Sequence, residues 1–505
     1  MNRDAATALA STPARPPRAE HDARTIFEVS RPGRRGVSVP APGVPCRGID
    51  TLLPPWARRR TPPRLPEVGE LQLVRHYTRL SRRNFSIDTH FYPLGSCTMK
   101  YNPRVNEQVA AEPGFAHLHP YQPPEQTQGA LELMWRLERM LATITGLHAI
   151  SLQPAAGAHG ELTGLLCIRA YHRARGDEHR LRVLIPDSAH GTNPASVSTC
   201  GMHAVAVRTG ADGRIELADL ESKLDENTAA LMVTNPNTLG LFETQLPEVC
   251  ERVHAAGGLV YMDGANLNAI LGLVRPGRLG IDVMHLNLHK TFSTPHGGGG
   301  PGSGPIAVTS ALEPYLPVPR VVRREDGRFE LSSDFPHSIG RVKAFLGHAA
   351  MFWRAYTYLR AHGAHDLVQI ARHAVLNANY VLARLRPHYD LPYPGPCMHE
   401  VVFSARRQKR LGVSALDIAK LLLDAGFHPP TIYFPLIVPE ALMIEPTETE
   451  SRETIDAFCD AMIAIARLAE TDPERAHEAP VTTPVGRIDE VAAARRPVLR
   501  WQPGE

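Results

Sequence analysis

Long hydrophobic runs are missing from this sequence. Its 505 residues are 43% hydrophobic, but no apolar stretch approaches the ~18 residues that are needed to cross a bilayer. The first residues also lack the pattern of a secretory signal. The sequence therefore predicts a soluble protein of the cytoplasm that has no membrane partner.

Cysteine is scarce, and the motifs of several common sites are absent. The seven cysteines are scattered and never form a Cys-x-x-Cys pair, which argues against a zinc ribbon and favours a reducing compartment. The glycine-rich stretch 297–304 lacks a Walker ending, and no Gly-x-Gly-x-x-Gly follows a predicted strand. His285 and His289 lie four residues apart on a predicted strand, where their rings do not converge, so no metal site is predicted.

Lysine is absent from residues 1–66, which hold 12 arginines, 5 acidic residues and 12 of the 45 prolines. This composition predicts a largely extended arm, which is either solvated or wrapped around a partner subunit. Glu20 and Asp22 do not suit a transit peptide. Because the arm has no clustered aromatic residues for stacking, no nucleic-acid partner is predicted. Residues 473–505 are predicted to form a polar tail.

Strands and helices alternate through the middle of the chain, as is typical of a mainly parallel α/β sheet. Strands are predicted at 181–185, 204–207, 230–234, 259–262, 283–288 and 305–308, and helices at 70–80, 127–145, 161–175, 217–224 and 247–256. We therefore predict an N-terminal segment with a loop near the site (67–125), a large domain (126–350) and a smaller C-terminal α/β domain (351–472).

The C-terminal domain has its own helix and strand signals. Helices are predicted at 374–385, 415–425 and 454–469, and a strand at 442–444. Ser414 is a predicted N-cap with Asp417 three residues later, and Gly426 is a predicted C-terminal cap.

Polar residues follow several predicted strands directly. In a parallel sheet, ligands gather at the carboxyl ends of the strands. The residues at those ends are Asp187 to Pro194, Asn235 to Thr238, Asp263 to Asn266 and His289 to Thr291. Small residues around Gly157 run straight into a helix, where free amides and the helix dipole make a phosphate cradle.

These positions meet the four needs of pyridoxal phosphate, which are a lysine, a carboxylate at the pyridine nitrogen, a phosphate cradle and a flat group over the ring. Lys290 is the predicted Schiff-base lysine, and Asp263 can keep the nitrogen protonated. His190 or His159 can stack on the ring. The phosphate is assigned to Gly157, Ala158 and Thr291, and further cofactor contacts are predicted for Asn237 and His289.

Longer motifs resemble the P protein of the glycine cleavage system, glycine dehydrogenase (decarboxylating), and in particular the lysine-bearing half of its two-chain form. The resemblance spans about residues 70–470. The motifs that carry it are His90-Phe-Tyr-Pro-Leu-Gly-Ser-Cys-Thr-Met-Lys100, Asp187-Ser-Ala-His-Gly-Thr-Asn-Pro194, Asp263-Gly-Ala-Asn266, Asn287-Leu-His-Lys-Thr-Phe292, the glycine run 297–304, Pro430-Thr-Ile-Tyr-Phe-Pro435 and Ile444-Glu-Pro-Thr-Glu-Thr-Glu450.

This resemblance implies an aspartate-aminotransferase-like fold, that is, a pyridoxal-phosphate enzyme of fold type I. It implies that Lys290 carries the cofactor, that Asp263 contacts the pyridine nitrogen and that His190 stacks on the ring. The implied reaction removes the carboxylate of glycine as carbon dioxide and passes the aminomethyl group to the lipoyl arm of the H protein. The implied partners are the paralogous subunit 1 and the H protein, in a dimer of two-subunit heterodimers.

The resemblance also places the 90–100 loop and the glycine run at the border of the site. The residues expected at the substrate or lipoyl entrance are Ser96, Cys97, Thr98, Gly298 and Gly299. Three alternatives stay open from the sequence. They are another enzyme of the same fold, such as an amino-acid decarboxylase or a serine-hydroxymethyltransferase-like aldolase, a silent scaffolding subunit, and a nucleotide-binding protein.

Overall fold

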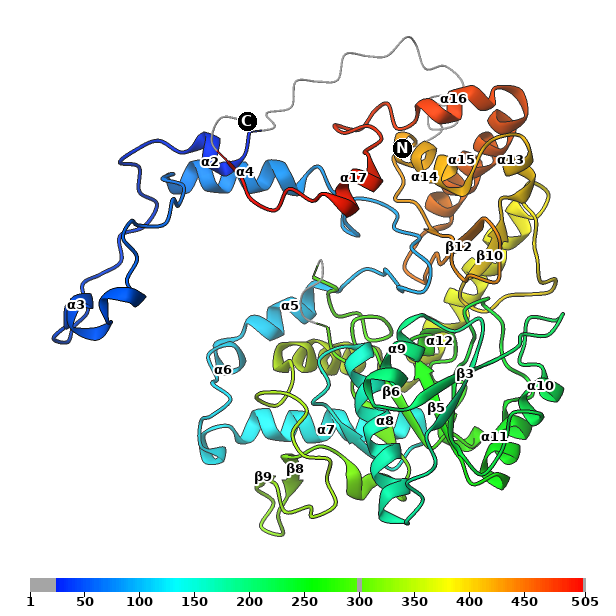
Figure 1. The fold of residues 1–505 in the computed structure, drawn as a ribbon, viewed down its shortest axis with the longest axis horizontal. Helices are drawn as coiled ribbons and strands as arrows, with labels where there is room; N and C mark the ends of the chain where they lie inside the picture. The colour runs from blue at the N-terminus through cyan, green and yellow to red at the C-terminus, as the bar shows by residue number, and fades with distance from the viewer. Residues whose placement is uncertain (1–23, 298–301, 503–505) are drawn as a thin grey trace. The chain divides into compact units, whose positions relative to one another are not determined.

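The computed structural model describes residues 24–297 and 302–502, in which the chain forms two units (Figure 1). One unit is Ile87–Pro480, and the other comprises 24–86 and 481–502. Gly298 and Gly299, which were predicted at the entrance, lie outside the described residues. Across the described ranges, no helix combines the length and the apolar character that a membrane crossing requires.

The first unit is built on a seven-stranded sheet with the order β1-β7-β6-β5-β4-β2-β3. Neighbouring strands from β6 through β3 are parallel, and β7 is antiparallel to both β6 and β1. The strands are β1 (Ala149–Ser151), β2 (Arg182–Pro186), β3 (His203–Val207), β4 (Thr228–Thr234), β5 (Leu259–Gly264), β6 (Val283–Leu286) and β7 (Ile306–Val308). The predicted mainly parallel sheet is confirmed, while the three-residue β1 was too short to predict.

Helices cover both faces of the sheet because its strands are apolar on both sides. Along β4, Leu231 and Val233 point into the core that includes α7 and α11, and Ala230 and Met232 point into the core that includes α8 and α9. The covering helices are α7 (Gln128–Thr145), α8 (Gly157–Ala174), α9 (Thr192–Thr199), α10 (Leu217–Glu221) and α11 (Leu246–Ala255). The period of two along the strand therefore builds a three-layer unit.

Helix α9 corrects one expectation. The stretch Asp187 to Pro194 was predicted only as polar residues after a strand, and no helix was predicted where α9 begins at Thr192. The helix has no apolar period, and a proline in its first turn is compatible with helical geometry. Its hydroxyl groups serve the site instead of the core, as described below.

A second, smaller sheet lies within the same unit and has its own hydrophobic core. The strands β10 (Val401–Ser404), β12 (Ala441–Ile444) and β11 (Thr431–Ile432) are antiparallel. They pack with α12 (Ala349–Leu385), α14 (Ala415–Asp424) and α15 (Arg452–Thr471). The predicted cap of α14 is present, since Ser414 accepts the amide of Asp417 and Gly426 adopts a φ of +83°.

Helix α12 is longer than predicted and extends from one core to the other (Figure 1). Its backbone breaks at Gly363, where φ is 62° and ψ is 178°. The remaining short elements of this unit are α5 (Arg104–Ala111), α6 (Pro113–Ala116), η2 (Pro124–Gln126), η3 (Leu267–Ala269), η4 (Pro276–Leu279), η5 (Glu313–Tyr315), β8 (Arg320–Arg323), β9 (Phe329–Ser332), α13 (Arg406–Arg410) and α16 (Pro473–Glu478).

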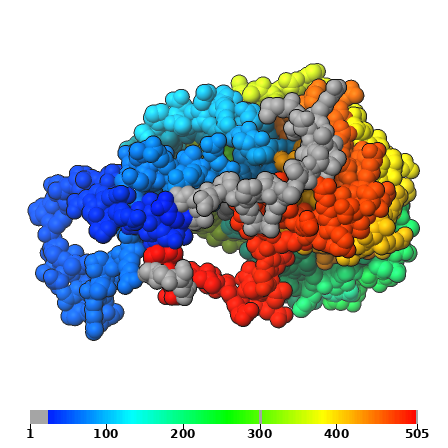
Figure 2. All heavy atoms as spheres, turned by 90° about the horizontal axis from the view of Figure 1, so that it is seen from above, coloured from blue at the N-terminus to red at the C-terminus, as the bar shows by residue number. Residues whose placement is uncertain are grey.

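The second unit contains little regular structure. Figure 2 shows residues 24–86, in blue, as an open chain rather than a compact body. Its elements are α2 (Ile26–Val29), α3 (Ile49–Leu52), η1 (Pro55–Ala57), α4 (Glu70–Ser81) and α17 (Glu490–Arg495). Trp56 is 87% exposed, and Phe27 stacks on Trp501 with ring centroids 4.8 Å apart. The helix predicted at 70–80 is confirmed, whereas the short helices of the arm were not predicted.

Candidate active site

A cavity of about 220 Å³ opens at the carboxyl ends of the central strands. Most of the predicted site residues line it, namely Ser96, Gly157, Ala158, His190, Asp263, His289 and Lys290. The wall also includes Glu161 and His285, which were not predicted. A larger surface cavity of about 570 Å³, around Tyr389 and Arg407, contains none of the predicted residues. The strand-end cavity is therefore the candidate active site.

Lys290 is distinguished from the other lysines by its surroundings. The chain has six lysines, and Lys290 is the one that lines this cavity in the described part of the chain. Its Nζ donates to the carbonyl of Ser96 at 2.7 Å. The buried Lys100, by contrast, donates to the Asn268 side chain, the Thr291 carbonyl and Glu448 at 2.7–2.9 Å. Lys290 is thus the lysine that a ligand in this cavity would meet.

Asp263 ends β5 beside this lysine and is almost fully buried, with 4% exposure. Its carboxylate accepts the amide of Ala265 at 2.9 Å and Nδ2 of Asn193 at 3.2 Å. Burial opposes ionisation, but the imidazole of His285, these hydrogen bonds and the charge of Lys290 outweigh it and lower the pKa of Asp263. The carboxylate is therefore charged at neutral pH.

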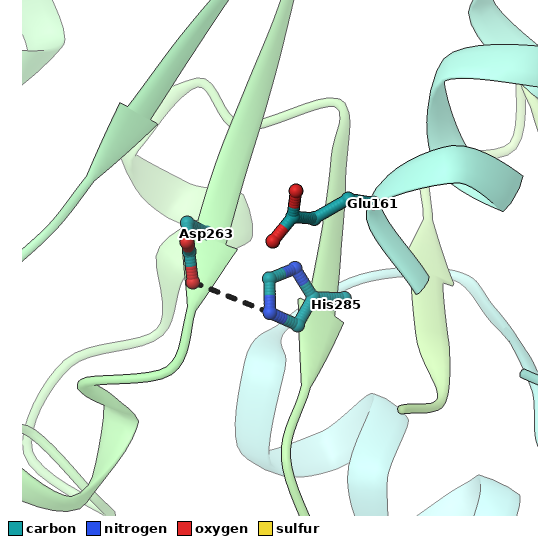
Figure 3. A group of neighbouring side chains, drawn as sticks. All are labelled: Glu161, Asp263 and His285. Atoms are coloured by element: carbon teal, nitrogen blue, oxygen red, sulfur yellow. Dashed lines mark ion pairs between the residues drawn. The ribbon is translucent and has the colours of Figure 1, made fainter. Parts of the chain in front are cut away.

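Asp263, His285 and Glu161 form a buried group that we call the sheet cluster, with ligating atoms that all lie within 4.8 Å (Figure 3). Nε2 of His285, on the adjacent strand β6, lies 3.2 Å from Asp263 (Figure 3). Nδ1 of His285 lies 2.7 Å from the hydroxyl of Tyr261. Burial raises the pKa of Tyr261 well above its ordinary value, so a neutral phenol fixes the imidazole that faces Asp263.

Glu161 connects the sheet cluster to His190. It projects from α8 (Figure 3) and accepts hydrogen bonds from Thr192 and Ser196, both at 2.8 Å. Nδ1 of His190 lies 2.8 Å from the Thr192 hydroxyl and 3.2 Å from its amide. The hydroxyl-rich first turns of α9 therefore orient the ring that the sequence assigned to stacking.

The part of the cavity at the start of α8 suits a phosphate. It is formed by the first residues of the 18-residue helix α8, whose N-terminus favours anions. A Cβ at Gly157 would lie 2.9 Å from the Asn287 side chain, so a larger residue would displace that amide from the cavity wall. Oδ1 of Asn287 is buried without a hydrogen-bond partner, as are Oδ1 of Asn266 and Oγ1 of Thr234 on the same wall. These free polar atoms fit a polar cofactor such as pyridoxal phosphate.

Two histidines near the lysine are held neutral. Burial, followed by the charges of His296 and Lys290, lowers the pKa of His289 to about 3. Burial and Lys290 lower the pKa of His296 to about 4. Their rings meet edge to face at a centroid distance of 5.2 Å. Lys290 is thus surrounded by imidazoles that add no positive charge at neutral pH.

The structure does not bring three predicted residues to the cavity wall. Asn237 is buried and donates to the Gly213 carbonyl at 2.8 Å and to Glu243 at 2.9 Å. Thr291 is 1% exposed, and its carbonyl accepts a hydrogen bond from Nζ of Lys100. The ring of His159, the alternative stacking group, accepts the amide of Ala155 at 3.1 Å. The position of a residue after a strand did not reveal which way its side chain turns.

The predicted entrance residues form a tight turn against the small sheet. Ser96 and Thr98 have positive φ values of 64° and 48°, a strained conformation for residues with a Cβ. Ser96 lines the cavity, and Thr98 is buried. Burial raises the pKa of the half-buried Cys97 thiol to about 11 although Lys290 opposes the shift. The thiol is therefore protonated and weakly nucleophilic.

A second buried group lies behind this turn, and we call it the turn cluster. It consists of His399, Glu400 and Glu445, whose ligating atoms also lie within 4.8 Å of one another. His399 and Glu400 were not predicted as site residues. Glu445 lies in one of the motifs that carried the resemblance, but no role was assigned to it.

The chain was compared with known sequences. Residues 49–327 match the family "Glycine cleavage system P-protein", and residues 370–481 match "Glycine dehydrogenase, C-terminal domain". A protein of Halalkalibacterium halodurans called "Probable glycine dehydrogenase (decarboxylating) subunit 2" is 59% identical over 481 residues, which cover 95% of this chain and 98% of that protein. The protein of that name in Exiguobacterium sibiricum is also 59% identical, over 95% of this chain and 97% of its own length.

Solved structures share the fold. A crystal structure of the glycine decarboxylase (P-protein) of the glycine cleavage system, in inhibitor-bound form, has a TM-score of 0.70 at 23% identity and covers 83% of this chain and 94% of that chain. A sphingosine-1-phosphate lyase of Burkholderia pseudomallei has a TM-score of 0.61 at 15% identity, over 84% of this chain and 97% of that chain. From the family matches and the near full-length relatives, we conclude that this chain belongs to the glycine dehydrogenase (decarboxylating) subunit 2 family of the glycine cleavage P-proteins.

Proposed function

We propose that this chain uses pyridoxal phosphate to decarboxylate glycine and passes the aminomethyl group to the lipoyl arm of an H protein. The observation that carries the proposal is the placement of Lys290 and a charged Asp263 on one cavity wall. The near full-length relatives named for glycine decarboxylation support it. The family makes another amino-acid decarboxylase of this fold the weaker alternative.

The residues of the cavity divide the work of holding the cofactor. Lys290 would bond to it, Asp263 would face its pyridine nitrogen, and His190 would lie over the ring. Gly157 and Ala158 would receive its phosphate at the start of α8. When bound, pyridoxal phosphate supplies an electron sink for the pair that is left when a bond to the α-carbon breaks.

Asp263 makes that sink effective by keeping a proton on the ring nitrogen. Its pKa is lowered by His285, by its hydrogen bonds and by Lys290, so it presents a negative charge rather than a neutral acid. A charged hydrogen bond of this kind contributes about 1.5–3 kcal/mol. By keeping the ring nitrogen protonated, Asp263 would strengthen electron withdrawal by the bound cofactor in the transition state.

Apart from Lys290, the cavity is poor in positive charge, which favours loss of a carboxylate. No arginine is among its lining residues in the described chain. His289 is neutral at pH 7 because its pKa is about 3. A substrate carboxylate is therefore weakly stabilised there, while the uncharged carbon dioxide needs no counter-charge.

The transfer step balances within the proposed partners. The bond between the α-carbon and the carboxylate breaks, and carbon dioxide leaves without the electron pair. That pair then forms a bond from the carbon to one sulfur of the lipoyl disulfide, the sulfur–sulfur bond breaks, and the other sulfur leaves as a thiolate that takes up a proton. The disulfide is reduced, so no nicotinamide is needed.

We further propose that subunit 1 completes the enzyme as a dimer of two-subunit heterodimers. This chain spans 98% of a relative whose name identifies it as subunit 2. A name of that kind implies a second, different subunit. The exposed arm of residues 24–86, with Trp56 87% exposed, offers apolar surface for such an assembly.

The test is the exchange of labelled bicarbonate into the carboxyl group of glycine. The chain is assayed with lipoylated H protein, with and without subunit 1. We expect exchange when both are present and none with Lys290→Ala, which should still fold. Bound cofactor without exchange in the full mixture would refute glycine as the substrate. Exchange by Lys290→Ala would remove Lys290 from its role.

A further inference from the structure

The turn formed by Gly95 to Thr98 is fixed to the small sheet by tight packing. A Cβ at Gly95 would lie 2.6 Å from the backbone oxygen of Met443 on β12, so a side chain has no room there. The carbonyl of Gly95 accepts the Thr431 hydroxyl at 2.8 Å. The turn therefore sits against β12 and β11.

Two buried carboxyl groups hold the next three residues of the turn. Glu400 accepts the amide of Ser96 at 2.8 Å. Glu445 accepts the amides of Cys97 at 3.1 Å and Thr98 at 2.8 Å, and also the Thr98 hydroxyl at 2.7 Å. Three consecutive amides thus point into the turn cluster. The left-handed φ values of Ser96 and Thr98 are maintained by these bonds.

The direction of these amides determines where the Ser96 carbonyl points. The Ser96 carbonyl shares a planar peptide group with the Cys97 amide. That amide donates to Glu445 at 3.1 Å, and the carbonyl accepts Nζ of Lys290 at 2.7 Å. Without these bonds, Ser96 and Thr98 would relax from their strained left-handed conformations. Relaxation would rotate the carbonyl away from the lysine.

A metal ion is a poorer explanation of the turn cluster. Three of the four carboxylate oxygens already accept hydrogen bonds from the turn. Burial and the neighbouring carboxylates raise the pKa values of Glu400 and Glu445. The positive charge of Lys290 acts on both glutamates and already supplies a counter-charge.

We propose that Glu400 and Glu445 are positioning residues for Lys290, because they shape the turn whose Ser96 carbonyl receives the lysine ammonium. The proposal rests on the proposed function in taking Lys290 as the residue that carries the cofactor. During each turnover the substrate amine replaces Lys290. The two protons that the substrate ammonium gives up then lie on Nζ, which becomes an ammonium, and no atom is oxidised or reduced.

The Ser96 carbonyl keeps that ammonium within reach for its return. A fixed acceptor at 2.7 Å removes most of the rotamer freedom of this long and flexible side chain. The hydrogen bonds of the turn cluster, rather than its charge, provide this function. A glutamine at either position therefore preserves it, and an alanine does not.

The experiment uses the holoenzyme with subunit 1 and two readouts. Cys97 reports on the turn, since it is half-buried and the other cysteines except the exposed Cys46 are buried. In a Cys46→Ser background, the rate of labelling of Cys97 by a thiol reagent measures opening of the turn. The rate at which the absorbance of the bound cofactor returns after glycine is removed measures the return of Lys290.

We expect Glu445→Ala to label Cys97 about tenfold faster and to slow the return of Lys290 about tenfold, as loss of a bond of about 1.4 kcal/mol predicts. Glu445→Gln should stay within about threefold of the parent in both. Glu243→Ala is the matched control. Glu243 is also buried and accepts a backbone amide, that of Ile215, but lies outside the turn cluster, so neither rate should change.

The proposal would be overturned if a folded, cofactor-bound Glu445→Ala labelled Cys97 and returned Lys290 at the wild-type rates. It would also be overturned if Glu445→Gln changed both rates as much as Glu445→Ala does. If Glu445→Ala does not fold, Thr98→Val removes one hydrogen bond to Glu445 and should raise Cys97 labelling about threefold. An unchanged rate there would also overturn it. If the absorbance of the parent does not respond to glycine at all, the proposed function is refuted instead. The labelling rates of Cys97 in the Glu445 variants would then still test whether Glu445 holds the turn.

Discussion

The sheet cluster and the turn cluster have the same composition but opposite electrostatics. Each contains one histidine and two carboxyl groups, all buried, within 4.8 Å. In the sheet cluster the pKa of Asp263 is lowered. In the turn cluster the pKa values of Glu400 and Glu445 are raised, and that of His399 is lowered to about 3 by burial and Lys290.

The difference arises from the partners of each cluster. Asp263 receives an amide, a side-chain amide and an imidazole, which together outweigh its burial. Glu400 faces another carboxyl group, and its histidine neighbour is too deeply buried to take up a proton. Composition alone therefore does not determine charge. The charged sheet cluster can keep a proton on a cofactor, whereas the turn cluster can only accept hydrogen bonds from the turn.

The largest difference in kcat is expected when one carboxylate in each cluster is replaced by its amide. Asp263→Asn removes a charge that the reaction uses and should lower kcat about 100-fold, which corresponds to ~3 kcal/mol. Glu445→Gln should change kcat less than about threefold. Steady-state bicarbonate exchange by both variants measures this. Equal losses would show that the two clusters act alike.

Acid should affect stability through the buried histidines with lowered pKa values, which are His289, His296 and, in the turn cluster, His399. Because the pKa of folded His399 is about 3, the unfolded chain binds the proton earlier, and stability falls as pH drops below about 6.5. From pH 6.5 to 5 the loss for this residue is about 2 kcal/mol. The lowered pKa of Asp263 keeps its contribution until pH falls below its ordinary value near 3.8.

Urea unfolding of His399→Gln and of the parent at pH 7 and pH 5 measures this loss. The variant should lose about 2 kcal/mol less than the parent between the two pH values. The same loss in both would contradict a neutral, buried His399.

A smaller effect is expected at the hydroxyl that fixes His285. Tyr261→Phe removes its 2.7 Å hydrogen bond to Nδ1 while keeping the ring in the core. We expect kcat to fall about fivefold, because ~1 kcal/mol of orientation is lost. In an Asp263→Asn background, Tyr261→Phe should not lower kcat further, because His285 then has no carboxylate to interact with. Independent, additive losses would contradict this coupling.

No effect is expected from metal removal. The carboxylates of both clusters are engaged by hydrogen bonds from the protein. Dialysis against a chelator should leave cofactor content and exchange activity unchanged. A loss that added divalent ions restore would establish a metal in one of the clusters.

The sheet side of the site could be predicted from the sequence, because it depends on local order. Asp263 lies at the end of β5 and Lys290 shortly after β6, and the parallel pairing of the two strands brings these ends together. The same rule was less informative for Asn237, whose side chain turns into the protein. Glu161 was overlooked because its partners lie on α9, a helix without an apolar period.

The turn side could not be predicted in the same way. The bond from Ser96 to Glu400 spans 304 residues, and the bond from Thr98 to Glu445 spans 347. A buried glutamate has no periodic signature, and its role depends on a strained turn that only the folded chain forms. The motif at 90–100 indicated that a loop borders the site, but not what holds it.

The most direct test of the account is to reduce the holoenzyme with borohydride and to locate the attached cofactor by peptide mass spectrometry. With six lysines in the chain, the attachment point can be assigned without ambiguity. The account predicts a single modified residue, Lys290, and no attachment in Lys290→Ala. Attachment at Lys100, or at any of the other lysines, would contradict the site between the two clusters.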